Sequence, residues 1–511
     1  MMSATTVPFP EGVKYNSKLP SAVASGKVAN RKYYATNSNS VFSYSTTNEI
    51  RIDVSAERNT FLNTAQGFLE FSLGVQTASL TSLDGSAASW IQEFRIQSLG
   101  QDIELISNYN LIYTILLQYT STVSSLISSN ALMGSYRNIN MIPTFDSTPL
   151  AGNVLNGNCF NIQSTGAVLT NFSSTGGRSN INPFDCASIE FGYAKTFCVP
   201  LVSGFLSGDT YLPMAGKGFT IILRLAQDAM LGVYGGAGTY TISNISYNVP
   251  VITITDPVFN QAFEEMFQDQ KSINFYGQTY KNSVSAVVGT GGSQSVLVND
   301  RSRSLNAVLC CLRCNNVAIA STTRCALSCR TIAQVSSFQI RIGDQLYPSQ
   351  QIDIAASAVS GGLIAGGRAD VQSRGLGSDQ INLNVSRCMA EVMKCFRSLN
   401  RDLGTGCVSL DNFSSDEGLT LTPGTITPNS STTIKANALS HYGMGILGVD
   451  LSVYSGDESV ISGIDTASNN LNLTLLFNFQ TVPNATYEVQ TFCVVDAIYS
   501  LNYDGSYSAY Y

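Results

Sequence analysis

The sequence predicts an all-β protein in which one β-sandwich domain is used twice. Three observations predict this fold class. Short segments in which apolar and polar residues alternate recur along the 511 residues. Long stretches rich in Ser, Thr, Asn and Gly connect them. Segments of the first half recur in the same order in the second half, about 250 residues later.

The clearest of these segments starts at Phe338. Phe338, Ile340 and Ile342 alternate with polar residues, which is the pattern of a strand with one buried face. Gly343-Asp344 predicts a turn. The chain around Pro348 is expected to be extended, because a residue before proline avoids the helical region. The segment is therefore predicted to be a hairpin over 338–354.

A weaker relative of this hairpin spans Trp90–Ile103, where Phe94 and Ile96 precede Ile340 and Ile342 by 246 residues. Two further pairs of segments match in the same order. They are Tyr240/Ile242 with Tyr487/Val489, at an offset of 247, and Ile222/Leu225 with Leu473/Leu476, at an offset of 251. Because the offset is so long, the pattern indicates a duplicated domain and not a solenoid, whose repeats are about 20 to 50 residues.

The chain is predicted to divide into four parts: an N-terminal arm over residues 1–40, a first jelly roll over 41–256, a linking helix over 257–270 and a second jelly roll over 271–511. The arm is expected to be irregular to about residue 35. It is basic, with five Lys or Arg residues against Glu11, and either a solvated tail or a binding arm would fit. Asp256-Pro257 is typical of a helix start.

Each half is predicted to contain roughly eight strands, the number in a jelly roll. In the first half the expected strands lie at 50–54, 69–73, 189–202, 219–225 and 240–254, around the hairpin at 90–103. In the second half they lie at 273–288, 305–318, 445–454, 471–479 and 487–499, around the hairpin at 338–354. Helices are expected at 111–119 and 389–396, each after its hairpin, and long loops at 121–185 and 400–440.

Composition excludes several classes of protein. Only 12% of the residues are charged, about half the usual share. The net charge is −7, whereas a nucleic-acid binder normally has a basic excess, so sequence-specific nucleic-acid binding is not expected. No secretory signal is recognised, since Met1–Thr6 leads into two prolines. No apolar run reaches about 18 residues, and Leu111–Leu117 is the nearest candidate for a membrane span.

Catalytic, metal and cofactor sites are not predicted. His441 is the one histidine, and its surroundings lack a nucleophile-elbow pattern. Cys310, Cys311 and Cys314, followed by Cys325 and Cys329, invite a zinc interpretation, but their spacing does not fit two CxxC pairs. The twelve cysteines are expected to be free, buried thiols. The glycine-rich stretches 289–293 and 361–367 lack the Lys-Ser/Thr of a phosphate loop.

Three segments together resemble the double jelly-roll major capsid proteins of polinton-like viruses and virophages, within the wider PRD1/adenovirus and giant-virus lineage. The most specific is Phe338–Ile352, a strand followed by Gly and Tyr-Pro-Ser. The others are Leu471–Phe477 with the later Val494–Tyr499, and the strand Ser45–Val54 with the following Asn63–Phe68. The resemblance covers most of the chain in order.

The resemblance implies a structural protein without enzymatic activity, located in the virion. A homotrimer would form a pseudo-hexagonal capsomer that tiles an icosahedral shell beside neighbouring capsomers. The expected partners are minor capsid and penton proteins, with an internal membrane or the genome as contacts of the N-terminal arm. A carbohydrate-binding or adhesive β-sandwich protein, such as a fibre or spike, is the alternative, and a hydrolase on a β-scaffold is a third class.

The C-terminal tail Tyr503–Tyr511 is rich in aromatic residues and carries one charged side chain, Asp504. It would suit either a frayed end or a strand at an interface. The interface is favoured, because aromatic residues are enriched at contacts.

Overall fold

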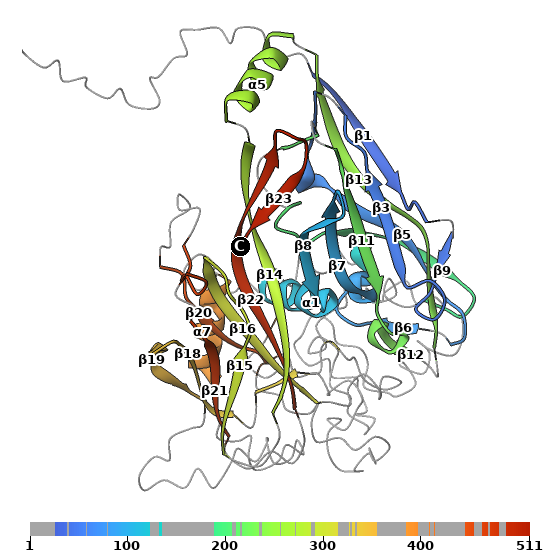
Figure 1. Ribbon diagram of the computed structural model, residues 1–511. Helices are drawn as coiled ribbons and strands as arrows, with labels where there is room; N and C mark the ends of the chain where they lie inside the picture. The colour runs from blue at the N-terminus through green and yellow to red at the C-terminus, as the bar shows by residue number, and fades with distance from the viewer. Residues whose placement is uncertain are drawn as a thin grey trace, which may run out of the picture.

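A computed structural model gives the architecture (Figure 1). It describes residues 26–511 apart from 38–39, 58, 79, 123–131, 135–188, 207–210, 215–216, 235–237, 256, 271, 288–291, 315–326, 328–329, 333–334, 355–384, 397–407, 409–412, 414–444, 454–461, 469–470 and 480–486, with single side chains left out in some elements.

The first half of the chain forms one β-sandwich. Its larger sheet has seven strands, in the order β10-β4-β13-β5-β9 with β1 and β2 also paired to β13, and its smaller sheet is β3-β11-β7-β8. A two-stranded sheet joins β12 to β6. The strands are β1 (Gly26–Tyr34), β2 (Val41–Phe42), β3 (Glu49–Val54), β4 (Thr60–Leu62), β5 (Phe68–Val75), β6 (Leu80–Leu83), β7 (Ile91–Ser98), β8 (Gln101–Ser107), β9 (Ala194–Pro200), β10 (Leu212–Pro213), β11 (Phe219–Leu225), β12 (Gly232–Tyr234) and β13 (Tyr240–Ile254).

The second half forms another sandwich. Its six-stranded sheet runs β14-β22-β16-β17, with β20 on β16 and β23 on β22, and its four-stranded sheet is β15-β21-β18-β19. The strands are β14 (Ser272–Val287), β15 (Ser293–Val298), β16 (Leu305–Cys314), β17 (Arg330–Thr331), β18 (Val335–Ile342), β19 (Gln345–Asp353), β20 (Leu447–Asp450), β21 (Leu473–Phe479), β22 (Tyr487–Asn502) and β23 (Tyr507–Tyr510). Each sheet draws its described strands from one half of the chain alone.

Four α-helices are described, and three of them occupy the predicted places. These are α1 (Tyr109–Thr120), α5 (Pro257–Gln270) and α7 (Val385–Cys395), and the fourth, α4 (Asp228–Leu231), is a single turn. Helix α5 connects the two halves along the chain and lies at the top of the view in Figure 1. Phe263 of α5 packs edge-on against Phe61 of β4, and Phe267 packs against Tyr503 beside the C-terminal strand. The linking helix therefore contacts both halves.

The pairing registers show that the two four-stranded sheets are copies of one another. Phe94 of β7 pairs with Leu223 of β11, and Phe338 of β18 pairs with Phe477 of β21. Val54 pairs with Phe219 and Val298 with Leu473 in the same way. These pairs give an offset of 244 residues between β3 and β15 and between β7 and β18. They give an offset of 254 residues between β11 and β21.

The predicted offsets are thereby corrected. The offset of 246 for the hairpins is wrong by two residues, an even number that keeps each side chain on its face. The offset of 251 is wrong by three residues, so the match of Ile222 to Leu473 joined opposite faces; the counterpart of Leu473 is Phe219. Apolar alternation has a period of two, so it cannot distinguish shifts of two residues, and in strands this short a shift of one residue still matches some apolar residues.

The prediction that the N-terminal arm is irregular to about residue 35 is wrong for residues 26–34. Gly26–Tyr34 form β1, which pairs without interruption with β13. The sequence GKVANRKYY has little apolar alternation, because an outer strand needs only backbone hydrogen bonds to a long neighbour. Residues 1–25 lie outside the described part of the chain, and so do most of the predicted loops 121–185 and 400–440.

Candidate functional site

The part of the molecule with the most buried polar chemistry is the joint between the two sandwiches, and its centre is Glu104. Glu104 lies on β8 and is only 1% exposed. Its carboxylate accepts hydrogen bonds from the backbone N–H of Gly204 (2.8 Å) and the hydroxyl of Thr279 (2.7 Å), and from Ser203. Tyr499 of β22 donates a longer bond, of 3.3 Å. One carboxylate therefore joins donors from both halves.

The surroundings of Glu104 also perturb its protonation. Burial raises the pKa of the Glu104 carboxyl, while the hydrogen bonds from Ser203, Thr279 and the backbone N–H groups of Gly204 and Phe205 act in the opposite direction. Loss of hydration is the larger effect, because removing a charge from water costs more free energy than hydrogen bonds from neutral donors restore. Sequence reasoning missed this residue. Its signal is a lone acid in the apolar run Ile103–Ile106.

An aromatic cluster surrounds the same point. Phe205 lies in the loop after β9. The centroid of its ring is 5.2–5.5 Å from the centroids of four other aromatic rings. One of the four belongs to the first half and three to the second: Phe219, Phe275, Tyr499 and Tyr507. Three of the four contacts are edge-on, and such contacts add to the free energy gained from burial. The loop acts as a plug between the sandwiches.

The backbones of the two halves also approach closely here. A Cβ atom on Gly277 of β14 would overlap the carbonyl group of Gly204, and one on Gly204 would lie 2.6 Å from the hydroxyl oxygen of Tyr499. Only glycine fits at such a contact. The glycines at both positions therefore allow the two halves to approach this closely.

A chain of side-chain amides continues the joint toward α1. Asn108, which precedes α1, donates to Asn282 of β14 (2.9 Å) and to Gln490 of β22 (3.1 Å). Gln92 of β7 donates to Asn108 (2.5 Å). Polar groups that leave water are stabilised when they are hydrogen-bonded to one another, so this chain fixes the relative position of the two sheets.

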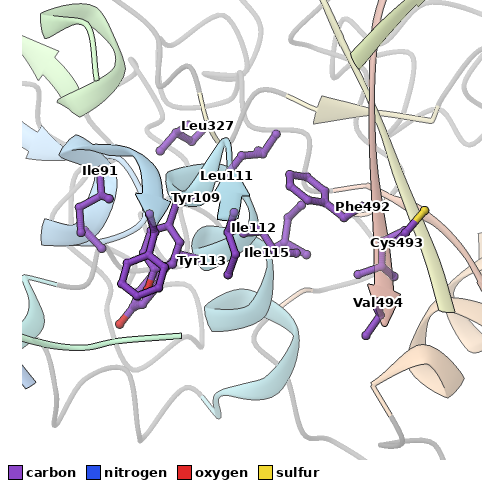
Figure 2. Packing of buried hydrophobic residues seen from close by; sticks show 14 of the residues in the cluster. Ile91, Tyr109, Leu111, Ile112, Tyr113, Ile115, Leu327, Phe492, Cys493 and Val494 are labelled. Atoms are coloured by element: carbon purple, nitrogen blue, oxygen red, sulfur yellow. The ribbon is translucent and has the colours of Figure 1, made fainter. Parts of the chain in front are cut away.

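Helix α1 of the first half also packs against the second half. Figure 2 shows Phe492 of β22 facing Leu111, Ile112 and Ile115 of α1. Tyr119 at the end of α1 stacks on Phe396, which follows α7, at 5.3 Å. The buried Arg330 of β17 donates to Gln118 of α1. Helix α1 therefore lies at the joint, and the residue that follows α7 reaches it.

The C-terminal tail is a strand, β23, and the interface it forms lies within the chain. Tyr507 is buried and donates to the carbonyl oxygen of Pro213 (2.8 Å), and Tyr511 donates to that of Ile103. The N–H of Lys217 donates to Gly505 (2.8 Å). The tail of the second half thus binds the first half, as the central position of β23 in Figure 1 illustrates.

The hairpin of the second half has different surroundings. Ile96 faces Glu104 across the first hairpin, and the equivalent Ile340 faces Tyr347 across the second. Tyr347 is half-buried, and Tyr347 donates to Gln345 of its own strand (2.7 Å). Most of β19 is exposed, including Leu346. The inner strand β18 of this hairpin is therefore part of the core, whereas its outer strand β19 lies at the molecular surface.

The prediction of free, buried thiols is confirmed for four of the six described cysteines, whereas Cys198 and Cys395 are free but only partly buried. Six cysteines are free: Cys198, Cys310, Cys311, Cys388, Cys395 and Cys493. Burial raises the pKa of Cys311 to about 11 and raises that of Cys310 as well, so both are thiols near neutral pH. Cys310 and Cys311 are neighbours on β16 and point to opposite faces of the sheet.

Several predicted features fall outside the described residues. They are His441, the glycine-rich stretch 361–367, residues 289–291 of the glycine-rich stretch 289–293, Cys325, Cys329 and the side chain of Cys314. Within the described ranges no three His, Cys, Asp or Glu side chains are grouped as metal ligands, and no helix is long and apolar enough for a membrane span. The prediction of no catalytic, metal or cofactor site stays a prediction.

Comparison with known proteins identifies the fold. No family model and no curated protein matches the sequence. Among solved structures, a quasi-atomic model of the PBCV-1 virus capsid aligns over 98% of this chain and 100% of its own, with 10% identity and a TM-score of 0.51. The cryo-EM structure of the Sputnik virophage aligns over 99% and 93%, with 11% identity and a TM-score of 0.51. The predicted double jelly roll is thereby confirmed.

Proposed function

We propose that this chain is a major capsid protein, which assembles as a homotrimer into pseudo-hexagonal capsomers of an icosahedral shell. The observation that carries the proposal is the joint: two copies of one sandwich, held together by Glu104 and the Phe205 plug, within a fold that aligns with capsid structures over nearly its whole length. The role is structural and needs no catalytic residue.

The duplication supports the trimer on geometric grounds. A chain with two similar units behaves as two neighbouring positions of a ring. Three such chains related by threefold symmetry therefore supply six similar positions, and a tile with six similar edges can surround itself with copies. A rigid joint is needed, because the angle between the two units sets the shape of the tile.

The surface composition supports the same role. Charged residues make up 12% of the chain, so its surface as a whole is expected to be mainly neutral and polar. Faces of this kind can be buried against neighbouring capsomers, minor capsid proteins or penton proteins without the large cost of desolvating charges. The N-terminal arm before β1 would face a membrane, the genome or a neighbouring capsomer. The protein would be located in the virion shell.

The oligomeric state tests the proposal. We expect the purified full chain to have about three times its subunit mass of 54.7 kDa by analytical ultracentrifugation. Electron microscopy of concentrated samples should show hexagonal arrays of such trimers. A chain that stays monomeric at all concentrations and binds glycans on an array would instead support the carbohydrate-binding alternative.

A further inference from the structure

The molecule carries two equivalent edge strands with different neighbours. β8 ends the sheet β3-β11-β7-β8, and β19 ends the sheet β15-β21-β18-β19. β8 lies against β14 and β23 of the other half, where Glu104 meets Thr279 and Tyr511 meets Ile103. β19 has the same place in its own sheet, yet its side chains are exposed apart from Ile352 and the half-buried Tyr347 and Pro348.

The strand that receives β8 also has an equivalent. β14 is the first described strand of its half and pairs with the last long strand, β22. β1 is the first described strand of the other half and pairs in the same way with β13. β1 is exposed along Lys27–Asn30, and its Val28 and Tyr34 are 71% and 63% exposed.

The two bare surfaces cannot meet within one molecule. β19 and β1 lie at opposite sides of the molecule in Figure 1. Both expose apolar side chains, Leu346 at 43% on β19 and the two residues named above on β1. An exposed edge strand with apolar side chains is a site where another chain can bind.

The charges on the two surfaces favour this contact. Lys27 is exposed on β1, where Arg31 and Lys32 form ion pairs with Glu57 and Glu70. The turn before β19 exposes Asp344, and the end of β19 exposes Asp353; Arg341 on β18 is the one exposed base beside them. The charges on the two surfaces are therefore of opposite sign, basic on β1 and slightly acidic on the β18–β19 hairpin.

From these observations we propose that β19 of one chain docks on β1 of a second copy, as β8 docks on β14 within the chain. The inference rests on the proposed function, since it assigns the surfaces that hold the capsomer together. The contact uses two different patches, so it is head-to-tail. Such contacts close into a ring when the rotation between neighbours allows it.

Two variants of the full chain test the contact. One carries Val28→Asp and Tyr34→Asp on β1, and the other carries Leu346→Lys and Gln350→Lys on β19. Each places like charge opposite the partner surface, which should raise the dissociation constant of the oligomer by about 100-fold or more. A control carries Ser295→Lys and Leu297→Lys on β15, at the far edge of the sheet, where Leu297 is 55% exposed.

Mixing the two variants is the decisive measurement. Each variant alone should sediment as a monomer, with a circular dichroism spectrum and melting temperature like those of the wild type. Their equimolar mixture should form a one-to-one dimer and nothing larger, because one intact β19 meets one intact β1. The control should assemble like the wild type.

The other outcomes separate the inference from the proposed function. If the wild type is trimeric and both variants are trimeric as well, the docking proposal is wrong and the capsid proposal stands. If both variants are monomeric but the mixture also stays monomeric, head-to-tail docking is overturned. If the wild type itself is a monomer at all concentrations, both proposals fail.

Discussion

The hairpins β7–β8 and β18–β19 are copies that the chain uses in two environments. In both, an isoleucine on the inner strand, Ile96 or Ile340, faces the outer strand at the same place in the sheet. In the first hairpin that place holds Glu104, which is buried by the second half. In the second it holds Tyr347, which stays half-exposed.

The difference shows that sheet position and surface chemistry are encoded separately. The apolar inner strands specify the sheet, because alternation selects which face is buried. The outer strands carry the residues that distinguish a contact within the chain from a free surface. A buried carboxylate suits a permanent contact, since it is stable only where every donor is in place. An exposed strand such as β19 suits a contact that forms after folding.

The largest effect is expected for the aromatic plug. Phe205→Ala removes a ring that packs on Phe219 of the first half and on three rings of the second. The free energy of unfolding should fall by about 3–5 kcal/mol, the usual cost of a large cavity. Urea denaturation measures it. An effect below about 1 kcal/mol, the level of a surface change, would contradict the tight joint that distinguishes the first hairpin.

The close approach of the backbones should give the next largest effect. Gly277→Ala places a methyl group against Gly204, so the halves must separate, at a cost of about 1–3 kcal/mol or more. Gly292→Ala is the matched control, since its nearest atom would be 3.7 Å away. Thermal melts of both variants make the comparison. Equal melting temperatures would show that the joint tolerates extra volume.

The carboxylate should give a smaller effect that depends on pH. Glu104→Gln puts an amide N–H₂ among hydrogen-bond donors and should cost about 1–3 kcal/mol. Gln345→Ala on the bare hairpin should change stability by less than about 0.5 kcal/mol. If the two substitutions had equal effects, the contrast between the hairpins would be lost.

The direction of the pH dependence follows from the pKa of Glu104. Burial raises this pKa above its unfolded value of about 4.3. The folded state then holds the proton more tightly, so the linked stability is complete below the unfolded pKa and is lost as pH rises through the folded pKa. The stability of the wild type relative to Glu104→Gln should therefore decline as pH rises above about 4. Denaturation series at several pH values would measure this slope, and a rising difference would contradict it.

Much of the fold could be predicted from local pattern. The strands β11 and β13 have the predicted bounds, and α1, α5 and α7 lie where helical spacing placed them. Core strands can be recognised in the sequence because their side chains alternate between a buried face and a solvent-exposed face. β1 was predicted to be irregular, and the tail that forms β23 was predicted as an interface strand without its sheet, since an outer strand can be held by backbone bonds that leave no pattern in the sequence.

The joint shows the limit of that reasoning. The sequence by itself determined the all-β class, the duplication and the places of the hairpins, because these depend on periodicity and order along the chain. Only the tertiary structure decided that Glu104 is buried, that Gly277 meets Gly204 and that Tyr511 binds the first half. Each of these contacts joins residues more than 70 positions apart, and nothing local to either residue records its partner.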